Sequence, residues 1–177
     1  PSKPETLPGL ACRWHLAGAE PAPRPLNTHL DDLPMGAPIY KDFLRAENYS
    51  FNLSRHPFIQ IMAGRGCSSR CFFCAWPQTS HGHEYRFRSA ENIVDEMLWV
   101  QTKWPEIKQI NIEDENFAEE RAFARRFGDE ARGRNLTLPF HANISTSMEV
   151  SSLEALQKAG LRSCSVGFDT SRFSLLA

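Results

Sequence analysis

From Pro57 onward, short β-rich runs alternate with amphipathic helical runs, and this order constrains the fold more than any other feature of the sequence. The strands that the pattern predicts cover residues 58–63, 107–114, 138–145 and 162–169. The helices predicted between them cover residues 89–104, 118–133 and 150–160. Alternation at about 25–45 residues per unit is typical of βαβ crossovers and indicates a parallel sheet.

Four strands are too few to close a barrel. We therefore expect an α/β fold, a partial (βα) barrel with about four parallel strands, whose chemistry lies on the loops that follow the carboxyl ends of the strands. In the first helix, Ser89 is the expected start and Pro105 the stop. The third helix is predicted to begin with a capping box from Ser151 to Glu154 and to end at Gly160.

The first 57 residues read as a linker. Five prolines lie between Glu20 and Pro38, and each proline fixes φ and removes a backbone donor. We expect residues 1–57 to be irregular and residues 58–177 to form the N-terminal part of the barrel. Because the chain begins at Pro1 and stops shortly after a predicted strand, we also expect it to be a piece of a longer protein.

The composition limits the classes of partner and the compartment. The 177 residues carry a formal net charge of −1 at pH 7, so no overall charge points to nucleic acid or to an anionic membrane. No apolar run reaches the roughly 18 residues of a transmembrane segment, and no leader opens the chain, so we expect a cytoplasmic protein. The five cysteines are an odd number, which argues against a disulfide framework. Cys12 and Cys164 stand alone and are expected to be buried thiols.

The other three cysteines, Cys67, Cys71 and Cys74, lie within eight residues, directly after the first predicted strand. A structural zinc site needs four ligands, and the candidates nearby are His81 and His83, one residue apart. A redox pair of Cys71 and Cys74 leaves Cys67 unexplained. A 4Fe–4S cluster held by three thiolates uses all three and leaves one iron open to a small-molecule ligand.

This C-x3-C-x2-C loop after a first strand resembles the radical S-adenosylmethionine (SAM) superfamily. Cys67, Cys71 and Cys74 match its cluster ligands, and Phe73 matches the aromatic residue before the third cysteine. The resemblance implies a 4Fe–4S cluster whose open iron binds the amino and carboxylate groups of S-adenosyl-L-methionine. It implies reductive cleavage of SAM to a 5′-deoxyadenosyl radical, with an electron donor such as flavodoxin or ferredoxin.

Further stretches are similar to the subfamily that carries a cobalamin-binding domain, and within it to the hopanoid-biosynthesis-associated branch. They are "PRPLNTHLDDLP", "CAWPQTSHGHEYRFRSAENIVDEM", "IEDENF" and "ANIS". This implies that residues 1–57 link a missing N-terminal cobalamin domain to the barrel. It also implies radical chemistry on a small-molecule or lipid-linked substrate with a polyol or aminosugar group. Alternatives are a B12-dependent radical SAM methyltransferase and a non-catalytic iron–sulfur or zinc module.

Other candidate contacts to SAM lie at strand ends. Glu113, Asp114 and Glu115 follow the second strand, where carboxylates suit a positively charged sulfonium. Asn143 lies on the third strand. Asp169 follows the fourth, where the branch has Glu-Ser-Gly and this chain departs from it.

Further polar side chains are candidates for site roles. Period-two alternation turns Asn111 and Glu113 toward the barrel lumen, and His141 alternates in the same way, so it suits either an interior hydrogen bond or a ligand contact. Arg86 and Arg88 are expected to form a solvated basic patch. His81 and His83 are expected to shape a flexible loop rather than to bind metal.

Overall fold

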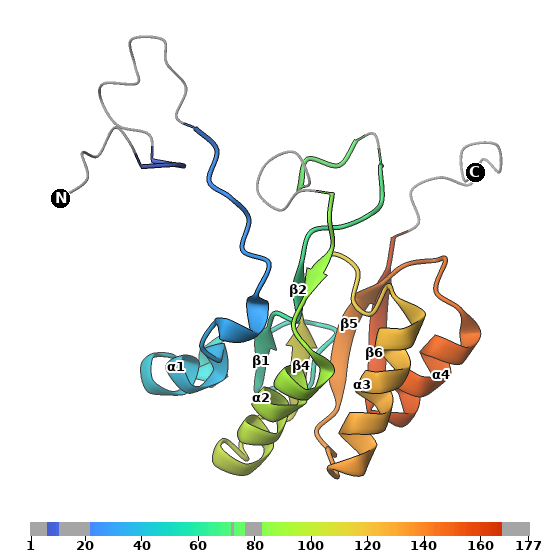
Figure 1. Ribbon diagram of the computed structural model, residues 1–177. Helices are drawn as coiled ribbons and strands as arrows, with labels where there is room; N and C mark the ends of the chain where they lie inside the picture. Colours follow the sequence, from blue (N-terminus) through green and yellow to red (C-terminus); the bar gives the residue numbers. More distant parts are fainter. Residues whose placement is uncertain (1–6, 11–21, 72, 77–82, 168–177) are drawn as a thin grey trace.

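The computed structural model describes residues 7–10, 22–71, 73–76 and 83–167 and shows one four-stranded parallel sheet (Figure 1). The strands pair in the order β1-β4-β5-β6. They are β1 (Phe58–Ile61), β4 (Gln109–Ile112), β5 (Phe140–Ile144) and β6 (Leu161–Val166). The α/β class and the four parallel strands predicted from the sequence are confirmed, and the arrangement is compatible with part of a barrel.

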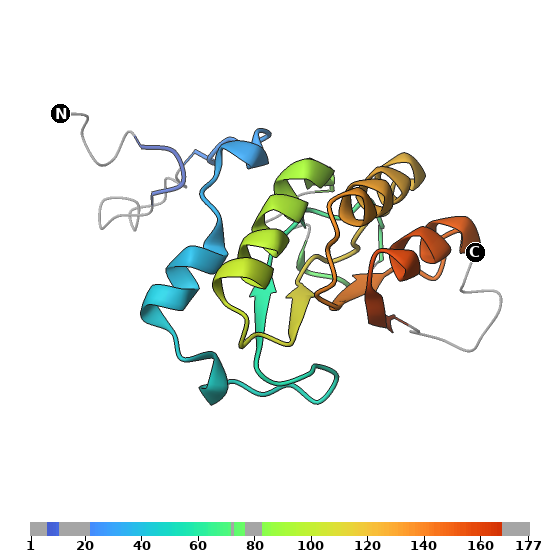
Figure 2. The same cartoon turned by 90° about the horizontal axis from the view of Figure 1, so that it is seen from below.

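Three helices pack on one face of this sheet, as Figures 1 and 2 show. They are α2 (Ala90–Lys103), α3 (Arg121–Gly133) and α4 (Val150–Lys158). The strand side chains on this face are apolar, and Ile110, Ile112 and Phe140 are fully buried there. Phe117 contacts Phe127 and Phe140 edge-on, with ring centroids 5.3 and 6.2 Å away. The helix layer and these rings form the core.

The opposite face of the sheet is polar. Gln60 pairs in register with Asn111, Asn111 with His141, and His141 with Ser163. The segment 44–57 lies on this side of the sheet, opposite α2, α3 and α4 (Figure 2), and the Ser54 hydroxyl donates to Asn111 Oδ1 over 2.9 Å. In a (βα) barrel the helices lie outside the strands, so a face without helices corresponds to the inner face.

A small antiparallel ribbon forms the base of the cysteine loop. It consists of β2 (Gly64–Arg65) and β3 (Arg86–Phe87). The ribbon continues from the carboxyl end of β1 and rises above the sheet (Figure 1).

The stretch expected to be irregular contains a helix, α1 (Gly36–Phe43), and two 3-10 turns, η3 (Leu30–Asp32) and η4 (Ala46–Asn48). The first turn of α1 is tied to α2, because the Ala37 N–H donates to Glu96 Oε1 over 2.8 Å. An irregular 1–57 was therefore wrong for this part of the stretch. Pro38 does not prevent the helix, since proline is tolerated in a first turn, where its missing N–H has no helical partner.

Two further expectations about side chains were wrong. Arg86 and Arg88 are buried, not solvated; Arg88 forms an ion pair with Glu96, with 2.5 Å between Nη1 and Oε2. Cys164, expected inside, is exposed on β6, an edge strand with one pairing partner among the described residues.

The predicted capping box of α4 was also wrong. Glu149, not Ser151, is the N-cap, and its side chain makes no cap hydrogen bond. Ser151 lies inside the helix, where its hydroxyl donates to Glu149 Oε2 over 3.4 Å. By contrast, Ser89 caps α2 as predicted and accepts a hydrogen bond from the Asn92 N–H. No helix in the described part of the chain is long and apolar enough to cross a membrane.

Candidate functional site

The residues that the sequence singles out meet at one edge of the sheet. β1 leads into the cysteine loop, β4 into Glu113, Asp114 and Glu115, and β5 ends with Asn143 and Ile144 (Figure 1). The carboxyl ends of parallel strands share an edge, so these segments are neighbours. Cys12, His81 and Asp169 lie outside the described residues.

The three clustered cysteines are free thiols with access to solvent. Cys67 and Cys74 are partly exposed and Cys71 is exposed, while the Cys74 N–H donates to the Cys71 carbonyl over 3.1 Å and closes a turn. Within residues 7–10, 22–71, 73–76 and 83–167, no three His, Cys, Asp or Glu side chains converge on one metal position. The donor set nevertheless fits an iron–sulfur cluster, because three accessible thiols share a loop whose base is fixed.

The cysteine loop also contacts the segment that precedes α3. The Ser68 hydroxyl, directly after Cys67, donates to Glu119 Oε1. The aromatic candidate Phe73 is 58% exposed. Its ring is thus open to the solvent, as a residue that contacts a bound ligand has to be.

Asp114 is the most buried of the acidic candidates, with no exposed surface. Its Oδ1 accepts from the Ala63 N–H and its Oδ2 from the Tyr85 hydroxyl, each over 2.9 Å. Burial raises the pKa of Asp114 above its usual value, and hydrogen bonds from the Gly64 backbone, Tyr85 and the Ala63 backbone oppose that rise. Burial and the nearby Asp114 carboxylate raise the pKa of the Tyr85 phenol, which keeps its proton and its role as donor.

Asn143 supports Asp114 from the neighbouring strand. Its Nδ2 donates to the Asp114 carbonyl and its own carbonyl accepts from the Phe117 N–H, both over 2.8 Å. Glu113 and Glu115 are only partly buried. Glu113 continues the β4 strand, since its N–H donates to the Ile61 carbonyl over 2.9 Å. Of the three acidic residues, these two are therefore the ones with surface available to a ligand.

His141 lies on the polar face below these residues and is buried. Its Nδ1 is 3.0 Å from the Ser163 hydroxyl and its Nε2 is 3.2 Å from the Ser165 hydroxyl. Burial lowers the pKa of His141, and the carboxylate of Glu113 opposes the shift. The imidazole is therefore neutral at pH 7, with one nitrogen donating and the other accepting.

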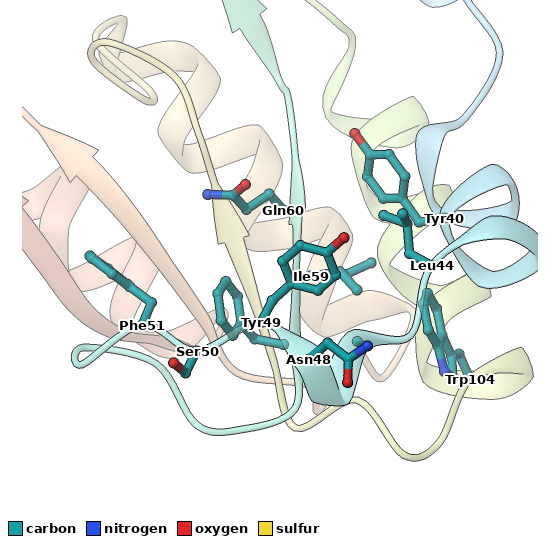
Figure 3. A pocket seen from close by; sticks show the side chains of 11 residues that line it. Tyr40, Leu44, Asn48, Tyr49, Ser50, Phe51, Ile59, Gln60 and Trp104 are labelled. Carbon is teal, nitrogen blue, oxygen red and sulfur yellow. The ribbon is translucent and has the colours of Figure 1, made fainter.

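A separate cavity of about 620 Å³ lies between α1 and β1 (Figure 3). Tyr40, Tyr49, Phe51 and Trp104 line it, together with Gln60. None of the residues predicted for the site borders it. The cavity and the cysteine loop are different places in the molecule.

The sequence reasoning missed Tyr85 and the contact between Ser68 and Glu119. Tyr85 lies within the stretch "CAWPQTSHGHEYRFRSAENIVDEM", and the sequence alone assigns it no role. The period-two alternation of the aromatic residues Tyr85 and Phe87 could have indicated that both face the same side of a short strand. In the structure their ring centroids are 5.6 Å apart. The partner of Tyr85 lies 29 residues away, a distance that local pattern does not reach.

Comparisons with known proteins give a distant relationship. No family model matches the chain. A protein of Pyrococcus horikoshii named as an uncharacterized methyltransferase is 32% identical over 95 residues. The alignment covers 54% of this chain and 19% of that protein, so the chain spans a small part of its relative's length. The chain thus has partial similarity to a methyltransferase.

Proposed function

We propose that this chain supplies the cysteine loop and the first strands of a SAM-dependent enzyme of the radical SAM type. The observation that carries the proposal is the position of Cys67, Cys71 and Cys74, which are accessible thiols on one loop at the carboxyl end of β1 in a parallel sheet. In this proposal the three thiolates hold a 4Fe–4S cluster. When bound, the cluster supplies the electron that cleaves SAM reductively.

The remaining candidates are assigned to SAM by position and charge. Phe73 offers an exposed aromatic face beside the third cysteine. Glu113 and Glu115 place partly exposed carboxylates at the same edge, where they favour a positively charged sulfonium. Asp169, beyond β6, belongs to the proposal on sequence alone.

Methyl transfer is the reaction class that we favour. The similarity to the Pyrococcus horikoshii protein supports it, and it replaces radical chemistry on a hopanoid-like head group as our leading hypothesis. Three further elements belong to this proposal: a cobalamin domain that residues 1–57 link to the barrel, a flavodoxin or ferredoxin donor, and a small-molecule or lipid-linked substrate. None of residues 58–167 is assigned to cobalamin.

The experiment is anaerobic reconstitution of the protein with iron and sulfide, followed by iron analysis and absorption spectroscopy. We expect about four irons per chain and a broad band near about 400 nm. Cys67→Ala, Cys71→Ala and Cys74→Ala should each remove the band, whereas Cys12→Ala and Cys164→Ala should keep it. A full cluster in Cys71→Ala, or a colourless zinc protein, would contradict the proposal.

A second measurement separates the reaction classes. The full-length protein with its proposed cobalamin domain is reconstituted, supplied with cobalamin, and incubated with methyl-labelled SAM, dithionite and a cell lipid extract. Methyl transfer predicts both S-adenosylhomocysteine and label in the lipid fraction. Formation of 5′-deoxyadenosine without label transfer would support the head-group alternative instead.

A further inference from the structure

The cysteine loop is anchored by the ribbon of β2 and β3, which is too short to fix the loop by itself. Its two stems pair only as Gly64 with Phe87 and Arg65 with Arg86, and the Arg88 N–H donates to the Ala63 carbonyl over 2.8 Å just below. A two-stranded ribbon of this size is marginal in water without further packing. Contacts outside the ribbon must help to fix the separation of the stems, and the hydrogen bond from Arg88 Nη1 to the Met62 carbonyl, 3.0 Å long, is one of them.

One carboxylate contacts both stems. Oδ1 of Asp114 accepts from the Ala63 N–H on the first stem, and Oδ2 accepts from the Tyr85 hydroxyl on the second. The Tyr85 ring lies directly over Gly64, where an added Cβ would be 2.8 Å from ring atoms. The stems are thus joined by two hydrogen bonds and by a contact that only glycine permits.

Asp114 is itself held by the sheet. The Glu113 N–H bonds to β1, and Asn143 on β5 donates to the Asp114 carbonyl over 2.8 Å. The carboxylate is fully buried, and its two oxygens are occupied by donors of the protein. Its position is therefore set by three strands and not by the loop.

We propose that Asp114, with Tyr85 as its partner, is a positioning residue that fixes the stems of the cysteine loop so that Cys67, Cys71 and Cys74 can act together. The proposal rests on the proposed function of these cysteines as cluster ligands. Asp114 acts on the loop through Ala63 and Tyr85 rather than by touching SAM. Supporting groups of this kind orient ligands and raise the retention of a metal.

The test compares Asp114→Asn and Tyr85→Phe with the unchanged protein after anaerobic reconstitution. The readouts are the rate of iron release to a chelator and the electron paramagnetic resonance spectrum of the reduced protein. We expect release to become about 10- to 100-fold faster, the usual effect of losing a supporting group, and the spectrum to broaden. Tyr49→Phe and Asp129→Asn are matched controls, because both residues are exposed, and they should change neither readout.

Thermal unfolding separates positioning from general destabilisation. Tyr85→Phe keeps the ring over Gly64 but removes the donor to the buried Asp114 Oδ2, so its unfolding midpoint should fall. Iron release is therefore measured well below the unfolding midpoint of every variant, where the variants are folded and release should still accelerate. Unchanged release and an unchanged spectrum in both variants would overturn the proposal. So would faster release that merely follows a fall in the unfolding midpoint.

Hydrogen exchange without metal keeps this proposal distinct from the proposed function. In the metal-free protein, Asp114→Asn should speed amide exchange in residues 62–66 and 84–88, since it disturbs the acceptor of the Ala63 N–H. If the unchanged protein takes up no iron but this exchange effect is found, the proposed function fails and the joining of the stems stands. If exchange at the stems is unaltered, the role of Asp114 is overturned whatever metal is bound.

Discussion

At the scale of single residues, the pair of Arg88 and Glu96 explains how a charged stretch becomes part of the core. Arg88 also donates to the Met62 carbonyl and to the Asn92 side chain, and Glu96 accepts from the Ala37 N–H. Every charge in this group meets an opposite charge or a dipole. The group joins α1, α2 and the end of β1.

Glu96→Ala should therefore destabilise the protein strongly. It leaves the buried Arg88 charge without its carboxylate, and breaking a buried pair in this way costs roughly 3–5 kcal/mol. The neighbouring Asp95→Ala is the control, because Asp95 is exposed and pairs with Arg134 at the surface, where the loss is about 0–1 kcal/mol. Urea unfolding of both variants measures the difference. Equal losses would show that the Arg88 pair is no stronger than a surface pair.

At the scale of elements, the contact between α3 and α4 depends on a glycine. A Cβ at Gly128 would lie 3.0 Å from the Ala155 carbonyl oxygen, whereas a Cβ at Gly133 would meet nothing within 4 Å. The two helices approach closely because Gly128 has no side chain. Both glycines belong to the same helix, so they form a matched pair for mutation.

Alanine at these two positions should have opposite effects. Gly133→Ala should stabilise the protein by a few tenths to about 1 kcal/mol, the gain in helix propensity. Gly128→Ala should lose more than that gain, because overpacking a close contact costs roughly 1–3 kcal/mol. Thermal or urea unfolding gives both values. A stabilised Gly128→Ala variant would contradict the close approach of α3 and α4.

The elements also show what local pattern can and cannot predict. All four strands and three helices were predicted because their apolar spacing repeats over several residues. The prediction of a capping box was wrong because an N-cap depends on backbone angles, and Glu149 rather than Ser151 has the extended conformation. The predicted burial of Cys164 was wrong because the exposure of a side chain on an edge strand depends on which other segments cover that strand. The hydrogen bond between Tyr85 and Asp114 could not be predicted because its two partners lie far apart in the sequence.

At the scale of the whole molecule, the sheet has two protected strands and two edges. β4 and β5 are paired on both sides, while β1 and β6 each have one pairing partner among the described residues. Residues along β6 alternate between partly buried and exposed. The stability of the sheet should therefore be highest in its middle.

Amide exchange should follow this order. We expect the amides of β4 and β5 to exchange at least about 10-fold more slowly than those of β6, since outward amides on an edge strand have no strand partner. Hydrogen exchange with mass spectrometry on the native protein measures this, and α2, which is buried against the sheet, serves as the slow reference. Protection of β6 equal to that of β5 would mean that further chain covers its edge.

The order of strands in the sheet also governs what happens while the chain is being synthesised. Within the four-stranded sheet, each strand pairs with the strand of that sheet made just before it, so the sheet can extend as the chain leaves the ribosome. The cysteine loop depends on the first of these pairings, because Ala63 receives its acceptor, Asp114, 51 residues later, when β4 pairs with β1. Until those residues emerge from the ribosome, the stems of the cysteine loop lack their hydrogen bonds to Asp114. The three thiols are then exposed to oxidants on a loop that is not yet fixed. Insertion of a cluster is therefore best timed after β4 has docked.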